Sequence, residues 1–261
     1  MMWSPKSPNG YVLPRPEKIF LDKKLNEISG LFYDKNTNNL LAISDDKRHI
    51  YRLTPEGKES ELFNKEFGPS ADYEDLTMVG QELFVLISSG TIVEITKNDS
   101  GFSTKAYPFW STARNDFETL YYDSAANSLV MLCKQCADEK GKHVRTAYRF
   151  DLSTHKFDTS PLYTINEKEV QDKLKDGRVE LKPSAAAIHP LQKRLYILSS
   201  AGHLLLITDL KGKVQEVYRL NPTFYPQAEG IAFAPNGDMY ISNEAKLGKP
   251  TLLKLNYKPE K

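Results

Sequence analysis

The chain has 261 residues, of which 40% are apolar and 26% charged, and its 35 basic and 34 acidic residues nearly cancel. This balance, without any basic stripe, argues against a nucleic-acid-binding surface, so we expect no nucleic-acid partner. No run approaches the roughly 18–20 apolar residues that a membrane span requires, so we expect no membrane-spanning segment.

The first residues predict a tail rather than part of the fold. Residues 1–16 are rich in Pro, Ser and Asn and contain no apolar segment, so they predict a short tail or linker and not a signal peptide. A chain that had lost an export signal would begin in the same way, which leaves the compartment open. Residues 17–261 are expected to form a single domain.

Five related segments recur along the chain at about the 44-residue period of four-stranded propeller blades, with one longer interval before the fourth. Each segment is closed by an apolar residue, and the positions two and four residues earlier are often acidic. The closing residues are Leu31, Leu76, Leu120, Ile188 and Ile231. Two positions earlier stand Ser29, Glu74, Glu118, Ala186 and Glu229; four positions earlier stand Glu27, Asp72, Asp116, Ser184 and Gln227.

Each segment is followed by a turn and then by three further predicted strands. The first is almost continuously apolar, which indicates burial on both faces; the second alternates apolar and polar residues, and the third is more polar. The apolar stretches are 40–43, 83–87, 129–132, 195–198 and 239–241. The alternating stretches are 50–53, 92–95, 148–152, 204–207 and 252–255, and the polar ones are 61–63, 104–107, 161–165 and 214–218.

The fifth repeat lacks an outer strand of its own, because the chain ends soon after Leu255. Residues 18–21, which precede the first repeat, have the character of the missing strand. An open array would leave two sheet edges exposed, whereas pairing the two chain ends closes the ring. We therefore predict an all-β fold: a five-bladed β-propeller of four-stranded antiparallel blades, closed by an N-terminal strand in the last blade.

One helical insertion is predicted between the third and fourth blades. It spans residues 167–175, with Asn166 as N-cap, Glu169 at the capping-box position and Gly177 as its stop. The insertion either decorates the surface or covers one mouth of the channel, and the sequence leaves both open.

The two cysteines, Cys133 and Cys136, follow a predicted strand and precede a predicted turn. Thioredoxin-like chemistry requires this spacing between a strand and a helix, and a zinc site requires a second pair of ligands. The context favours a local disulfide or two inert thiols over zinc binding or redox catalysis.

The recurring carboxylates predict a cation site on the propeller axis. Glu74, Glu118 and Glu229 should converge at one level of the channel and Glu27, Asp72 and Asp116 at the next, because residues two apart in a strand share a face. Oxygen-only ligands select a hard cation, and the loose geometry of a ring suits Ca²⁺ better than Mg²⁺. Asp46 and Glu244 are candidates for additional ligands at the mouth, and Asp75 for the second shell. The alternative is that these acids accept backbone N–H bonds or pair with Lys and Arg.

Four of the segments resemble the SdiA-regulated, YjiK-like family of bacterial envelope proteins. They are Leu25-Asn-Glu-Ile-Ser-Gly-Leu31, Asp72-Tyr-Glu-Asp-Leu76, Asp116-Phe-Glu-Thr-Leu120 and Gln227-Ala-Glu-Gly-Ile-Ala-Phe233. The resemblance covers residues 17 to 257 and implies a five-bladed propeller, a bound calcium ion and an exported or membrane-tethered location, in the periplasm or cell envelope. It implies no established biochemical activity.

Two functions follow from these observations. The first is a calcium-stabilised, non-enzymatic module, expected to be monomeric, that presents a channel mouth to a small molecule or protein. The second is a single-calcium-dependent hydrolase of lactonase or phosphoesterase type. No catalytic residue is assigned, because no histidine has a Ser or Cys partner that the sequence can place.

Overall fold

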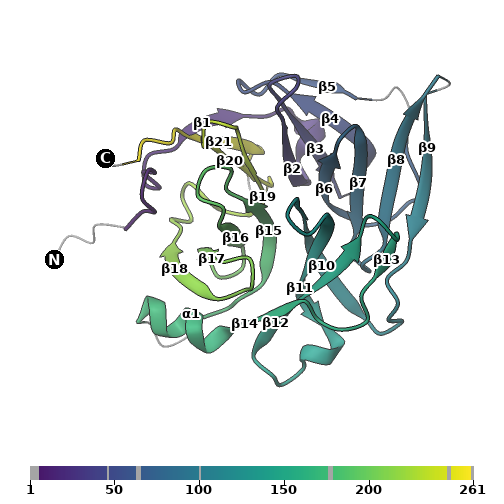
Figure 1. Cartoon of the computed structure of the whole chain (residues 1–261). Coiled ribbons are helices and arrows are strands. Elements are labelled where there is room, and N and C mark those ends of the chain that lie inside the picture. Colours follow the sequence, from purple (N-terminus) through teal and green to yellow (C-terminus); the bar gives the residue numbers. More distant parts are fainter. Residues whose placement is uncertain are drawn as a thin grey trace.

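The computed structural model describes residues 6–45, 47–62, 66–99, 101–175, 179–245 and 248–259. Within these residues, five antiparallel sheets stand around a common axis as the blades of a propeller, and the first strand of each blade lies at the centre (Figure 1). The predicted five-bladed all-β architecture is confirmed.

Blades 1 and 2 each consist of four consecutive strands. Blade 1 contains β2 (Ile28–Asp34), β3 (Asn39–Ser44), β4 (Lys47–Leu53) and β5 (Glu59–Glu61). Blade 2 contains β6 (Tyr73–Val79), β7 (Glu82–Ile87), β8 (Ile92–Asn98) and β9 (Gly101–Tyr107).

Blade 3 differs from the others in its outer strand, which is divided into two short pieces that both pair with β12. Pro161, which has no N–H to donate to a ladder, lies between the two pieces. Blade 3 contains β10 (Asn115–Asp123), β11 (Ser128–Cys136), β12 (Val144–Asp151), β13 (Lys156–Phe157) and β14 (Tyr163–Asn166). Blade 4 contains β15 (Pro183–Ile188), β16 (Leu195–Ser199), β17 (Leu204–Thr208) and β18 (Val214–Arg219).

Blade 5 is built from both ends of the chain. The N-terminal β1 (Glu17–Phe20) forms an antiparallel pair with β21 (Thr251–Leu255), which continues through β20 (Met239–Asn243) to β19 (Ala228–Phe233) at the centre. The predicted closure is therefore confirmed. It gives blade 5 the outer strand that the C-terminal segment does not supply.

The apolar core lies between neighbouring blades. One cluster, for example, joins Phe84 and Leu86 of β7 to Leu129 and Met131 of β11. Every residue of β16 and β17 is buried, because these strands are covered on both faces. This arrangement explains why the second strands read as continuous apolar runs and do not alternate.

Part of the predicted tail packs onto the propeller. Tyr11 and Leu13 are buried in the core shared by blades 4 and 5. The hydroxyl of Tyr225 donates a hydrogen bond to the carbonyl oxygen of Leu13 at 2.9 Å. The expected division between residues 1–16 and the domain thus does not coincide with a boundary of the core, since these two apolar side chains belong to it.

The predicted helix is present as α1 (Glu167–Leu174). The side chain of Asn166 accepts a hydrogen bond from the Lys168 N–H at 2.8 Å, which confirms the N-cap. The helix ends at Lys175 in the left-handed region; Gly177, the predicted stop, lies outside the described residues. α1 packs against β18 and β14 at the outer side of blades 3 and 4, so it decorates the rim and does not cover a mouth (Figure 1).

The other helical elements in the described residues are two short 3-10 turns, η1 (Lys23–Leu25) and η2 (Ala137–Glu139). None of the helices in the described part of the chain combines the length and apolar character that crossing a membrane requires.

Candidate cation site in the channel

The predicted glutamates sit at β-bulges near the start of the central strands. The pairing of β6 with β7 skips Glu74, that of β10 with β11 skips Glu118, and that of β19 with β20 skips Glu229. A bulge inserts one residue without a partner and re-aims its side chain. The same local irregularity therefore recurs in three blades at the position where the sequence repeats an acid.

The fourth repeat is shifted by two residues from the predicted alignment, which is corrected here. In β15 the bulge falls at Ser184, so Ser184 is equivalent to the glutamates and Ala186 to the apolar closing residues. Lys182 then occupies the outer position that the prediction gave to Ser184. A shift of two preserves the in–out alternation of a strand, so the run Ala185-Ala186-Ala187 could not reveal it.

Three of the six predicted ligands come together. The carboxylates of Glu74, Asp116 and Glu118 each offer an oxygen, and these atoms lie within 4.8 Å of one another between blades 2 and 3. Glu118 is 7% exposed, and its Oε2 atom is buried without a hydrogen-bond partner among the described residues. A buried carboxylate oxygen without a partner is energetically unfavourable unless a proton or a cation satisfies it.

A lysine that the prediction missed also reaches this cluster. Lys134, near the end of β11, forms an ion pair with Glu118 Oε1. It stands between Cys133 and Cys136, where the sequence drew attention to the thiols only. The sequence does contain a sign of it: Lys134 is the one basic residue in the strand that pairs with the acidic segment of blade 3.

Burial shifts the titration of these acids. It raises the pKa of Glu74 to about 9, with the charge of Asp72 as the next contribution. Burial likewise raises the pKa of Asp116 and takes that of Glu229 to about 7, while the charge of Lys134 opposes the shift in all three. An additional positive charge nearby would stabilise the ionised form of these buried carboxylates.

Two of the other predicted acids, Glu27 and Glu229, form a second group with Glu244 on the side of blades 5 and 1. Gln227 donates a hydrogen bond from Nε2 to Glu244 Oε2. The pKa of Glu244 is raised to about 8, first by burial and then by its hydrogen bond with Glu27. Glu27, Glu229 and Asp72 lie outside the three-carboxylate cluster, although Asp72 lines the same pocket as Asp116. Asp46 lies outside the described residues.

Asp75 does not face these acids. Its Oδ1 accepts a hydrogen bond from the Leu76 N–H at 2.8 Å, and its Oδ2 accepts one from the Leu120 N–H at 2.7 Å. The side chain thus bridges the central strands of blades 2 and 3. A role in the second shell of a metal stays a prediction. Both carboxylate oxygens accept hydrogen bonds from backbone N–H groups of the central strands.

The two cysteines form a disulfide, Cys133–Cys136. This is one of the two bonding states that their sequence context favours. Zinc coordination at this pair requires thiolates, and a disulfide has none to offer. The bridge closes the short loop that carries Lys134.

A polar pocket of about 790 Å³ opens beside the acidic cluster on the blade-3 side. Asp72 and Asp116 line it, together with the basic side chains of Arg114, His143 and Arg145. Arg145 is itself neutralised by Glu167 at 2.9 Å and Glu139 at 3.5 Å. The pocket therefore combines Asp116 of the candidate cation site, and the neighbouring Asp72, with basic side chains in one cavity.

These features define the chain as a five-bladed β-propeller with carboxylates converging at one end of its channel. The chain belongs to the SdiA-regulated family, whose pattern matches residues 17–247. No curated protein matches the sequence.

Solved structures share the fold at low sequence identity. Glutaminyl cyclase from Myxococcus xanthus aligns with a TM-score of 0.63 at 12% identity, covering 94% of this chain and 96% of that one. A luciferin-regenerating enzyme gives 0.55 at 13%, covering 93% and 95%, and a streptogramin B lyase gives 0.54 at 11%, covering 94% and 98%. At such identities the likeness concerns the propeller architecture alone.

Proposed function

We propose that this protein is a calcium-binding β-propeller whose acidic channel end holds one Ca²⁺ and whose mouths bind a ligand or protein partner. The observation that carries the proposal is the convergence of Glu74, Asp116 and Glu118 within 4.8 Å, with one buried oxygen of Glu118 that has no hydrogen-bond partner among the residues the structure describes. Asp72, Glu27 and Glu229 are the further predicted ligands, at neighbouring positions of the channel.

The donor set suits calcium. It contains only oxygen atoms, which favour a hard cation, and Ca²⁺ accepts 6–8 oxygens in irregular geometry whereas Mg²⁺ demands an octahedron. Lys134 is the counter-charge of Glu118 in this structure, so a divalent ion at the cluster has to compete with its ammonium group. When bound, Ca²⁺ supplies two positive charges that offset the repulsion among carboxylates of blades 2 and 3.

The test is a calcium titration of chelator-treated protein by calorimetry, with the melting temperature followed in the same samples. We expect a single site with a dissociation constant on the order of micromolar and a clear rise in melting temperature. The Glu118→Gln variant should bind at least about tenfold more weakly, whereas Glu82→Gln, which removes the same charge from an exposed position, should not. Absence of binding at millimolar calcium would refute the proposal.

The second candidate function is a single-calcium-dependent hydrolase, and the polar pocket favours it. A substrate held there would lie against Asp72 and Asp116, with Arg114 available to bind an anionic or carbonyl oxygen; His143, which also lines the pocket, has its Nδ1 at 3.2 Å from Glu167 Oε2. Lactones and phosphate monoesters should then be hydrolysed with calcium but not with chelator, and the Asp116→Asn variant should lose the activity. If neither class is turned over while calcium binds, the binding module stands alone.

The proposed location is the periplasm or cell envelope. Its support is the resemblance of the repeat motifs to envelope proteins and the Cys133–Cys136 disulfide, because structural disulfides persist in oxidising compartments. Trapping free thiols in intact cells before lysis tests it. The envelope assignment requires both cysteines to resist alkylation until a reductant is added, and rapid alkylation would contradict it.

A further inference from the structure

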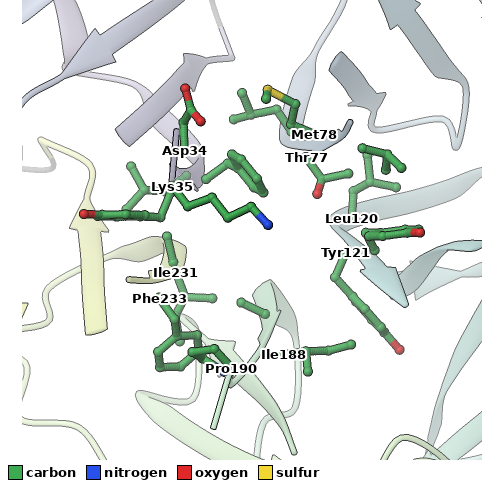
Figure 2. Close-up of a pocket in the computed structure, with 18 of the residues that line it drawn as sticks. Asp34, Lys35, Thr77, Met78, Leu120, Tyr121, Ile188, Pro190, Ile231 and Phe233 are labelled. Atoms are coloured by element: carbon green, nitrogen blue, oxygen red, sulfur yellow. The ribbon is translucent and has the colours of Figure 1, made fainter. Parts of the chain in front are cut away.

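The end of the channel opposite the acidic cluster contains a second cavity, of about 610 Å³. The central strands of all five blades line it, together with the turns after β2, β6 and β15, and Figure 2 shows side chains surrounding an open centre. Its walls are largely apolar, including Met78, Tyr121, Ile188 and Phe233. This cavity is distinct from the polar pocket beside the acids.

The two ends differ because the central strands change character along their length. In β6 the order is Glu74, Leu76 and then Met78, so Met78 lies about 13 Å beyond the acid at about 3.3 Å per residue. An apolar level separates the two ends. Its five members are buried and also line the cavity: Leu31, Leu76, Leu120, Ala186 and Ile231.

Among the residues that line the cavity, all of which belong to the described part of the chain, only Asp34 and Lys35 are charged. Asp34 is buried, and both of its carboxylate oxygens accept hydrogen bonds within its own turn. Oδ1 accepts one from the Asn36 N–H at 2.9 Å, and Oδ2 accepts one from the Thr37 hydroxyl at 2.7 Å. Lys35 is exposed, and its side chain extends across the cavity with the ammonium group over the centre (Figure 2). The cavity therefore offers an apolar interior with a single cation at its entrance.

We propose that this cavity binds an amphipathic anion, a medium-chain carboxylate, with its chain among Leu120, Ile188 and Phe233 and its carboxylate on Lys35 Nζ. The apolar walls provide the driving force, because burying the chain removes apolar surface from water. Lys35 selects the sign of the head group, since an anion gains an ion pair there and a cation is repelled. Nothing in this site depends on the cation site at the other end.

The experiment is calorimetric titration of the full chain, in chelator, with decanoate, decanol and decyltrimethylammonium. We expect decanoate to bind with one-to-one stoichiometry, decanol about threefold to fivefold more weakly and decyltrimethylammonium more weakly still, since an exposed ion pair contributes a factor of this size. The Glu118→Gln variant should bind decanoate unchanged, so a failure of the calcium proposal does not affect this one.

Three variants sharpen the result. Lys35→Glu should reverse the preference to decyltrimethylammonium, whereas Lys97→Gln, which removes a charge from an exposed position of β8, should leave it unchanged. Met78→Asp should abolish decanoate binding, with its melting curve showing that it is folded. Failure of decanoate to bind, binding that ignores the Lys35→Glu reversal, or binding that survives Met78→Asp in a folded protein would each overturn the proposal.

Discussion

Lys134 and Glu118 form an ion pair across the first two strands of blade 3, inside the acidic end of the channel. Glu118 stands at a bulge of β10 and Lys134 near the end of β11, one residue after a bridged cysteine. The ammonium group neutralises only part of the cluster, because Glu74 and Asp116 approach the same carboxylate. The ammonium group of Lys134 thus lies beside Glu118, where the calcium proposal places the metal ion.

The first prediction follows from this competition. Replacing Lys134 with Met removes the positive charge but keeps much of the side-chain length, so calcium should bind at least about tenfold more tightly, equivalent to ~1.4 kcal/mol. Without calcium the same variant should be less stable, because Glu118 is left as a buried charge without its partner. Calorimetry and urea unfolding measure the two effects. Lys156→Met, on exposed β13, is the matched control; equal affinities in the two variants would contradict the competition.

The second prediction concerns Asp75, the acid that joins blades 2 and 3. In Asp75→Asn one of the two acceptor oxygens becomes an NH₂ group facing a backbone N–H, so we expect a loss of about 2–3 kcal/mol in the free energy of unfolding. Urea denaturation measures it, with the exposed Asp99→Asn as the control. A loss below about 0.5 kcal/mol would show that the Leu120 amide does not depend on this carboxylate.

The architecture could be predicted from the sequence because it follows from a repeat. The periodic acidic segments and apolar strands fix the number of blades, and the missing outer strand after Leu255 fixes how the ring closes. Both are confirmed in the pairing of β1 with β21. Hydrophobic burial between blades imposes the same apolar pattern on every repeat. A wrong alignment of one repeat, such as the fourth, therefore does not change the predicted number of blades.

The details of the site could not be predicted, because they depend on single residues. A bulge has no sequence signature in this chain, so the sequence predicts the direction of the glutamates from simple alternation and not from the local irregularity that turns them. The alanine run in β15 hid a two-residue shift and with it Lys182, whose charge counters the raised pKa of Asp116. Lys134 comes from a neighbouring strand, which spacing along the chain does not reveal.

The third prediction concerns the disulfide. In the chain-entropy description, even a short bridged loop such as that of Cys133 and Cys136 contributes about 2 kcal/mol by restricting the unfolded chain. Adding reductant should therefore lower the melting temperature of the wild-type protein, and the double variant Cys133→Ser/Cys136→Ser should start lower and not respond. A wild-type melting temperature unaffected by complete reduction, verified by thiol titration, would contradict this.

The fourth prediction is a pH dependence of stability that originates at His189, a buried residue that follows β15. Its Nδ1 accepts hydrogen bonds from the Leu191 and Gln192 N–H groups, both at 3.1 Å. Nε2 therefore carries the proton and donates to the hydroxyl of Tyr11 at 2.8 Å, which in turn donates to the Gly237 carbonyl at 2.5 Å. The neutral ring is thus the form that the fold requires.

Burial, reinforced by the charge of Arg194, lowers the pKa of His189 from 6.5 to about 4. At pH values between these two pKa values, His189 binds a proton in the unfolded chain but not in the folded chain, so protonation favours unfolding. The stabilisation is complete above about pH 6.5 and is lost progressively as the pH falls towards 4, by up to about 3 kcal/mol. The other titratable groups around the ring are Tyr196, Tyr257 and Lys193.

Urea unfolding of the wild type and of His189→Gln at several pH values between 4.5 and 7.5 isolates this contribution, because the acids of the channel titrate equally in both. The difference in free energy of unfolding between the two proteins should be largest near pH 7 and shrink by about 2 kcal/mol towards pH 4.5. The variant His155→Gln, on an exposed turn, is the control. A wild-type advantage for His189 that stays constant or grows on acidification would mean that the ring is already charged in the folded protein.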